Sequence, residues 1–281
     1  MKRVILLQLL LLASVASAAT DPNLVGWWKF DDGTGNIAAD SAGSNNGAIY
    51  GATWVAGKIG SALSFDGVND YIDVLDNPAL RFTKSDSFSI CSWVKPTAGW
   101  GEILGKMQSG SQHGLFTYEV QWNSTSQSFD VLLCNSGYYY EYFVTPNNSA
   151  PAGSWYHIAA VYQNKNVIFY INGELACSGY FDSDPSGVAD RNLAMGVRAY
   201  AGVTERYFNG ALDDIRIYNR ALSADEIKQL YTGEEVNEPN LTALEIAGPD
   251  EVAEESTAAY KAIAHYDNGT TKDVTTLAEW L

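Results

Sequence analysis

Short segments rich in aromatic and β-branched residues, separated by turn signals about every ten residues, most limit how this chain can fold. Residues 88–94, Phe-Ser-Ile-Cys-Ser-Trp-Val, alternate between an apolar face and a mixed face, as half-buried strands do. Residues 114–122, 129–134 and 138–144 have a similar composition. Many short strands at such spacing predict an all-β protein built as an antiparallel sandwich.

The clearest local prediction is a three-stranded antiparallel meander, with strands over 155–163, 167–171 and 174–178. The dipeptide Asn172-Gly173 separates the last two strands. It favours a type I′ turn, because both central positions of that turn need positive φ.

A short helix is predicted directly after a last strand over 208–218. Ser223 and Glu226 have the spacing of a capping box, and Gly233 suits the C-terminal end. Residues 234–239 are acidic and end in proline, so a linker is predicted over 234–240. About 40 residues follow, which is too few for an ordinary sandwich, so we expect an N-terminal piece of a longer protein.

The N-terminus indicates export. Basic residues at Lys2 and Arg3 precede a short apolar run and small residues that end at Ala18. This pattern predicts a secretory signal peptide over 1–18 with cleavage after Ala18. The apolar run is too short for a membrane span, so we expect a secreted or surface protein without membrane insertion after cleavage.

The formal net charge of −16 argues against nucleic acid as a partner, because an acidic surface repels phosphate. Neutral polysaccharides and calcium remain compatible with it. Cys91, Cys134 and Cys177 lie in strand-like segments. Buried free thiols are expected there, although one unspecified pair could form a disulfide.

Residues 24–233 resemble the laminin-G-like, concanavalin A-like lectin and glucanase family, whose domains are jelly-roll sandwiches. The matching blocks occur in order: 26–35 (GWWKFDDGTG), 60–67 (GSALSFDG), 70–74 (DYIDV), 88–96, 155–157 (WYH), 170–174 (YINGE) and 210–222 (GALDDIRIYNRAL). The fold serves many functions, so the resemblance implies the fold more strongly than the ligand. Residues 241–281 resemble the first half of a bacterial immunoglobulin-like (group 2) domain, through 244–249, 260–262, 266–269 and 273–275.

The family resemblance also implies a structural calcium ion where the first and last strands meet. Asp213 is the best ligand on that basis, with Asp31 or Asp32 opposite it and a backbone carbonyl near Gly67 completing the shell. Carboxylate and carbonyl oxygens are the ligands that Ca²⁺ prefers. The alternative is that these acids are solvated or pair with Arg216 and Arg220.

Sugars stack on aromatic rings, so exposed aromatic residues are the candidate ligand contacts. Trp100 lies in a glycine-flanked loop, while Tyr118 and Trp122 share one face of a strand because they are four residues apart. Tyr138 and Tyr140 alternate with other tyrosines, so at least one ring must face away from the core. Ordinary core packing is the alternative for all five.

Catalysis finds little support in the sequence. A retaining glucanase of this fold needs a Glu-x-Asp-x-x-Glu strand with two carboxylates about 5.5 Å apart, and this chain has no such string. The sequence therefore predicts a non-catalytic carbohydrate-binding module that binds a polysaccharide or glycan. A protein–protein adhesion module that binds other surface proteins is the alternative, and a glycoside hydrolase is the third possibility.

Overall fold

The structure, a computed structural model, describes residues 21–83, 85–107, 116–134, 140–181, 191–200, 203–233, 241–249, 259–266 and 271–275. The chain divides into two compact units, one formed by residues 19–234 and the other containing residues 235–281. The predicted signal peptide and linker lie outside the described residues.

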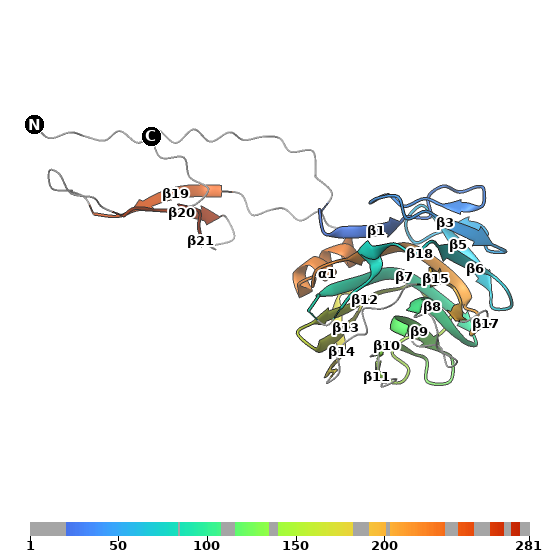
Figure 1. Ribbon diagram of the computed structural model, residues 1–281. Helices are drawn as coiled ribbons and strands as arrows, with labels where there is room; N and C mark the ends of the chain where they lie inside the picture. The colour runs from blue at the N-terminus through green and yellow to red at the C-terminus, as the bar shows by residue number, and fades with distance from the viewer. Residues whose placement is uncertain are drawn as a thin grey trace, which may run out of the picture. The chain divides into compact units, whose positions relative to one another are not determined.

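Two eight-stranded antiparallel sheets make up the first unit (Figure 1). Sheet A has the order β14-β13-β12-β7-β18-β5-β4, and β1 also pairs with β18. Its strands are β1 (Leu24–Trp28), β4 (Thr53–Ala56), β5 (Ser61–Asp66), β7 (Phe88–Ala98), β12 (Tyr156–Gln163), β13 (Asn166–Ile171), β14 (Glu174–Tyr180) and β18 (Asn209–Tyr218).

Sheet B has the order β11-β10-β9-β8-β15-β6-β3-β2. Its strands are β2 (Ile37–Ala38), β3 (Gly47–Tyr50), β6 (Tyr71–Val74), β8 (Trp100–Met107), β9 (Phe116–Asn123), β10 (Ser128–Cys134), β11 (Tyr140–Val144) and β15 (Leu193–Met195). A separate hairpin of β16 (Arg198–Tyr200) and β17 (Val203–Glu205) follows β15, and a 3-10 helix, η1, covers Pro78–Leu80.

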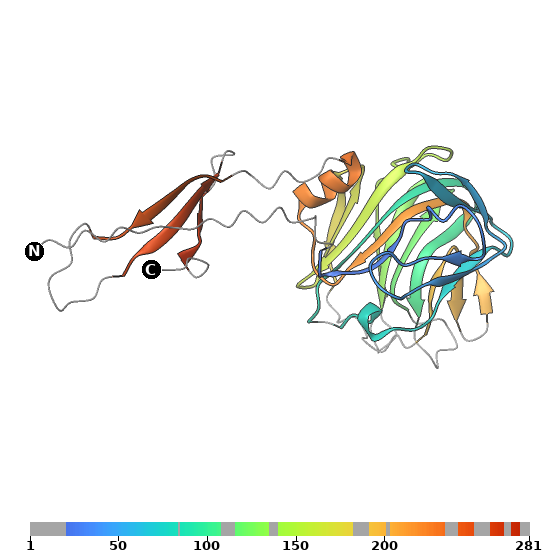
Figure 2. The ribbon, with the colours of Figure 1, turned by 90° about the horizontal axis from the view of Figure 1, so that it is seen from above.

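The two sheets face each other (Figures 1 and 2), and one apolar core lies between them. Ile90 and Leu212 enter it from sheet A, and Val120 and Leu133 enter it from sheet B. Along most strands alternate residues supply the core, as the period of two in a strand requires, but at the bulge in β8 the adjacent Ile103 and Leu104 both enter it. The predicted all-β sandwich is confirmed.

The meander and the helix have the predicted local structure. Strands β12, β13 and β14 pair in sequence, and Asn172 and Gly173 both have positive φ in the tight turn. Helix α1 (Ala224–Thr232) begins with a complete capping box between Ser223 and Glu226, and it ends at Gly233 in the left-handed conformation. Its Ile227 packs on the outward face of sheet A, against Cys91.

A β-bulge in β18 shifts by one residue the alternation of inward-facing and outward-facing side chains between the two halves of the strand. The pairing of β18 with β7 shifts between Asp213 and Arg216, and Asp214 takes a positive φ of 49°. The extra residue lets Asp213 share the outward face with its cross-strand neighbour Trp93 while Ile215 enters the core. The bulge thus sets which face receives the Asp213 carboxylate.

Cys91 and Cys177 are free thiols, and the side chain of Cys134 lies outside the described residues. In the second unit, the described residues form a three-stranded antiparallel sheet of β19 (Leu241–Ala247), β20 (Lys261–Tyr266) and β21 (Thr271–Asp273).

Candidate carbohydrate-binding face

The outward face of sheet B carries a group of buried polar side chains at its centre. In β9, Tyr118 and Val120 enter the core, so Glu119 and Gln121 between and beyond them point the other way. Glu102, Glu119 and Gln121 are nevertheless fully buried, and Asp130 on β10 is nearly so. Side chains must therefore cover this part of the face.

Two arginines that follow β15 hold Glu119. Arg198 Nη2 lies 3.1 Å from Glu119 Oε2, and Arg206 Nη1 lies 3.7 Å from Glu119 Oε1. Arg206 also donates to Gln121 Oε1 at 3.0 Å. Burial and the neighbouring Glu119 carboxylate raise the pKa of Glu102 well above its ordinary value. The group thus combines the guanidinium groups of Arg198 and Arg206 with the carboxyl groups of Glu119 and Glu102.

Trp100 lies on the solvent side of these polar side chains and packs against one of them. The Arg206 guanidinium carbon lies 4.1 Å from the centre of the Trp100 ring, within the range of a cation–π contact. The backbone amide of Glu102 donates to the Arg206 carbonyl at 2.9 Å. Gly101 lets the two segments approach, because a Cβ there would lie 2.5 Å from the Phe208 Cα. Trp100 remains 43% exposed, although Arg206 lies against its ring and the backbone of the next two residues is packed or hydrogen-bonded.

The prediction of Tyr118 and Trp122 as ligand contacts is wrong. Their side chains are 0% and 1% exposed. The Tyr118 hydroxyl donates to the Leu80 carbonyl at 3.0 Å, and Trp122 Nε1 donates to the Ala150 carbonyl at 3.0 Å. The two rings do share one strand face, as predicted, but that face is the core because it carries Val120 as well.

The remaining aromatic residues predicted as ligand contacts are Trp100, Tyr138 and Tyr140. Trp100 is exposed, as a ligand contact requires. Tyr138 lies outside the described residues, and Tyr140 is described only as the first backbone position of β11.

The sequence analysis missed Tyr50 and Tyr71. These are cross-strand neighbours in β3 and β6, and their rings stack with centroids 4.5 Å apart and planes 13° apart. The alternation of Tyr71 and Asp73 with the core residues Ile72 and Val74 was the available signal for their outward direction.

Two of the predicted calcium ligands, Asp213 and Asp31, bind the same turn. Strands β1 and β18 pair, as expected for the first and last strands. Asp213 Oδ2 accepts from the amides of Lys58 and Ile59 at 2.8 and 2.9 Å, and Asp31 Oδ1 accepts from the Ser61 amide at 3.0 Å. The two carboxylates therefore bind the same turn between β4 and β5.

The electrostatics of Asp213 would suit a cation. Its Oδ1 is buried and has no hydrogen-bond partner. Burial, with repulsion from Asp214 and Asp31, raises the pKa of Asp213 to about 7 against the effect of its backbone hydrogen bonds. A hard cation would satisfy the bare oxygen and offset this repulsion.

Asp32 and Gly67 do not join this pair. Asp32 Oδ2 accepts from the amide of Ala39, in a different segment, at 3.2 Å. Gly67 follows Asp66, which pairs with Asn209 at the far end of β18. In the part of the chain that the structure describes, no group of three His, Cys, Asp or Glu side chains is arranged to hold a metal.

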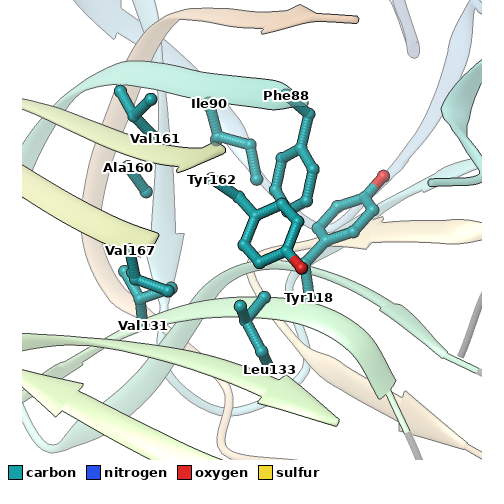
Figure 3. A pocket seen from close by; sticks show the side chains of 9 residues that line it. All are labelled: Phe88, Ile90, Tyr118, Val131, Leu133, Ala160, Val161, Tyr162 and Val167. Carbon is teal, nitrogen blue, oxygen red and sulfur yellow. The ribbon is translucent and has the colours of Figure 1, made fainter. Parts of the chain in front are cut away.

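The interior offers no room for a sugar at the cavity drawn in Figure 3. This cavity lies between the sheets, has a volume of about 10 Å³ and is lined by Phe88, Ile90, Tyr118, Val131, Leu133, Ala160, Val161, Tyr162 and Val167. Such a volume is about that of one water-sized probe. This cavity is therefore too small to hold a sugar.

Comparison with known proteins agrees with this architecture. Residues 66–228 match the model of the concanavalin A-like lectin/glucanases superfamily, and the chain belongs to that family. Domain 4 of AbnA, a GH43 extracellular arabinanase from Geobacillus stearothermophilus solved in complex with arabinotriose, is 24% identical. It has a TM-score of 0.57, over 74% of this chain and 98% of that chain.

Two further proteins are similar over different lengths. The binding domain of Paraclostridial Mosquitocidal Protein 1 has a TM-score of 0.60 at 17% identity, over 87% of this chain and 64% of that chain. The human adhesion G-protein coupled receptor D1 is 32% identical over 90 residues, which are 30% of this chain and only 10% of the receptor. Among the described residues, no helix has the length and hydrophobicity needed to cross a membrane.

Proposed function

We propose that residues 24–233 form an exported, non-catalytic carbohydrate-binding module whose contact surface is the outward face of sheet B. The observation that carries this proposal is the exposed Trp100 indole fixed on Arg206. A rigid aromatic ring gives the apolar face of a sugar a large contact area at low entropic cost, while nearby polar groups orient its hydroxyls. The arabinotriose bound by the AbnA domain supports a sugar ligand for this fold.

The charges on this face favour a neutral sugar. Arg206 is already paired with Glu119 and Gln121, so its charge is balanced within the protein. The formal net charge of −16 disfavours polyanions such as uronic acid polymers.

The same group of residues supports binding and not hydrolysis. A glycosidase needs two carboxyl groups that flank the scissile bond. Glu102 and Glu119 are two neighbouring carboxyl groups, but both are fully buried and Glu119 is paired with arginine. Neither presents an oxygen to a sugar on the surface.

Trp100→Ala tests the proposal directly. We expect it to weaken glycan binding at least tenfold, about 1.4 kcal/mol, measured by calorimetry after a screen of neutral polysaccharides that includes arabinotriose. Tyr180→Ala is the matched control, because it removes an exposed ring from β14 of sheet A, and we expect unchanged binding. Equal affinities for Trp100→Ala and the wild-type protein would contradict the proposed face.

A protein–protein adhesion module is the second candidate function. It is favoured by the sequence match to an adhesion receptor and by the exposed Leu175 and Tyr180 on the edge strand β14. It would lead if no glycan bound.

We also propose a structural calcium ion at Asp213 and Asp31, where a bare buried oxygen supports it. Free calcium at 100 times its Kd should stabilise the domain by about 2.7 kcal/mol, seen as a fall in Tm when EDTA is added. Asp213→Asn should abolish this fall, because it removes the charge and keeps an acceptor for the Lys58 amide. Asp32→Asn should retain it, and the same Tm with calcium and with EDTA in the wild-type protein would rule the ion out.

The remaining sequence predictions are proposals of the same kind. Residues 1–18 would direct export, which cleavage after Ala18 in the secreted protein would test. The three strands of residues 241–281 would form part of a bacterial immunoglobulin-like spacer.

A further inference from the structure

Two aromatic contact points, here called stations, lie on the outward face of sheet B. Trp100 is the first station, and the pair Tyr50 and Tyr71 is the second. Tyr50 is 47% exposed and stacks on Tyr71, which is partly exposed. The stacked tyrosines form a rigid aromatic surface with hydroxyl groups at its edge, a combination that is enriched at binding interfaces. This pair takes no part in the Trp100 station, and it lacks a role in the core.

The two stations are far enough apart to contact different sugars of one chain. Trp100 lies on β8, and the sheet order places β15, β6 and β3 after it. At about 4.8 Å per strand, β3 is about 14 Å from β8 across the sheet. A ligand that touches both stations must therefore be an extended oligosaccharide.

The segment before β18 contacts the first station. Arg206 lies over the Trp100 ring, and the next residue in the chain is Tyr207. Burial, followed by the influence of Tyr50, Asp73 and Tyr207, raises the pKa of Tyr71. The Tyr207 hydroxyl is anchored by donation to Thr204 Oγ1 at 2.7 Å.

A row of small residues crosses the strands between the two stations. Ala48, Asp73, Ala194 and Gly105 are successive partners across β3, β6, β15 and β8. Of these, only Asp73 has a side chain longer than a methyl group, and both of its carboxylate oxygens accept from Asn192 at 3.0 and 2.8 Å. Ala194 and Gly105 are buried, whereas Asp73 is partly exposed, so the Asp73–Asn192 pair is the oriented polar group of this row that a sugar hydroxyl could reach.

We infer that this module binds along an extended, neutral polysaccharide chain, with one sugar on Trp100 and a distant sugar of the same chain on the Tyr50–Tyr71 pair. The inference rests on the proposed function, since it specifies the ligand class of the same face. This inference has the distinguishing consequence that affinity depends on the length of the oligosaccharide. The Trp100 station contributes to binding at every length, whereas the Tyr50–Tyr71 station contributes only to the binding of long chains.

The test compares oligosaccharides from disaccharide to octasaccharide in neutral arabinan, xylan, cellulose and mannan series, with polygalacturonate as the anionic comparison. For the series that binds, affinity should rise with length until both stations are filled. Trp100→Ala should weaken every length. The double variant Tyr50→Ala/Tyr71→Ala should weaken the longest chains at least tenfold and leave the shortest that bind unchanged.

Different outcomes would overturn the extended-chain inference and the proposed carbohydrate-binding function. Tyr50→Phe/Tyr71→Phe keeps both rings and should bind long chains within about twofold of the wild-type protein, and thermal melting checks that each variant is folded. Affinity independent of length, long chains bound equally by the alanine variant, or preference for polygalacturonate would overturn the inference alone. Failure of the wild-type protein to bind any neutral series would overturn the proposed function with it.

Discussion

Trp122→Ala is expected to lower the free energy of unfolding by about 3–5 kcal/mol, the loss typical of a large aromatic residue removed from a core. Trp122 is among the largest fully buried side chains of the protein. Alanine would leave a cavity and would also remove the partner of the Ala150 carbonyl, which accepts from the indole at 3.0 Å. Chemical denaturation monitored by circular dichroism measures the change.

Trp122→Phe separates the two parts of this effect. Phenylalanine retains most of the apolar volume but cannot donate to Ala150, so the loss should be closer to the 1–3 kcal/mol of an unsatisfied buried carbonyl. Trp100→Ala is the contrasting surface variant, and we expect it to change stability by less than about 1 kcal/mol. A Trp122→Ala protein as stable as the wild type but defective in glycan binding would instead support the sequence-based prediction.

Features determined by neighbouring residues could be predicted from the sequence. The Asn172-Gly173 turn and the capping box of α1 are specified within a few residues, and both have the predicted form. The opposed directions of Tyr118 and Glu119 also follow from the period of a strand. The identity of the core face does not follow from one strand, because it depends on which partner sheet covers it.

The candidate site depends on contacts between distant parts of the chain. Arg206 supports Trp100, and Tyr50 stacks on Tyr71, through strand pairings that a single sequence does not reveal. The bulge at Asp214 similarly decides that Asp213 shares the outward face of sheet A, opposite to the face that carries Trp100. Gly67 was misplaced for the same reason, since the register puts its neighbour Asp66 beside Asn209 and away from Asp213.

Glu119→Ala should also destabilise the domain by about 3–5 kcal/mol, because it leaves buried arginine without its carboxylate. Arg198 and Arg206 both contact Glu119, whose side chain is fully buried. Glu205→Ala is the matched control. Glu205 also pairs with Arg198, at 3.6 Å, but 41% of its side chain is exposed, so its loss should cost at most about 1 kcal/mol.

The pH dependence of the Glu119→Ala effect tests the coupling with Glu102. In the wild-type protein the pKa of Glu102 is raised, first by burial and then by Glu119. The raised pKa contributes fully to the free energy of unfolding at a pH below the ordinary glutamate pKa. This contribution is lost as the pH rises from there toward the raised pKa of Glu102. Without Glu119, the pKa of Glu102 should fall, and the ionised Glu102 can replace Glu119 beside the arginines.

The difference in unfolding free energy between the Glu119→Ala variant and the wild-type protein should consequently shrink as pH rises above about 5. In the double variant Glu102→Gln/Glu119→Ala, no carboxylate can take over, so the difference should not shrink. A pH-independent loss in the single variant would show that Glu102 does not exchange roles with Glu119. The expected result would instead identify these two carboxyl groups as one counterion system that keeps Arg206, and hence Trp100, in place.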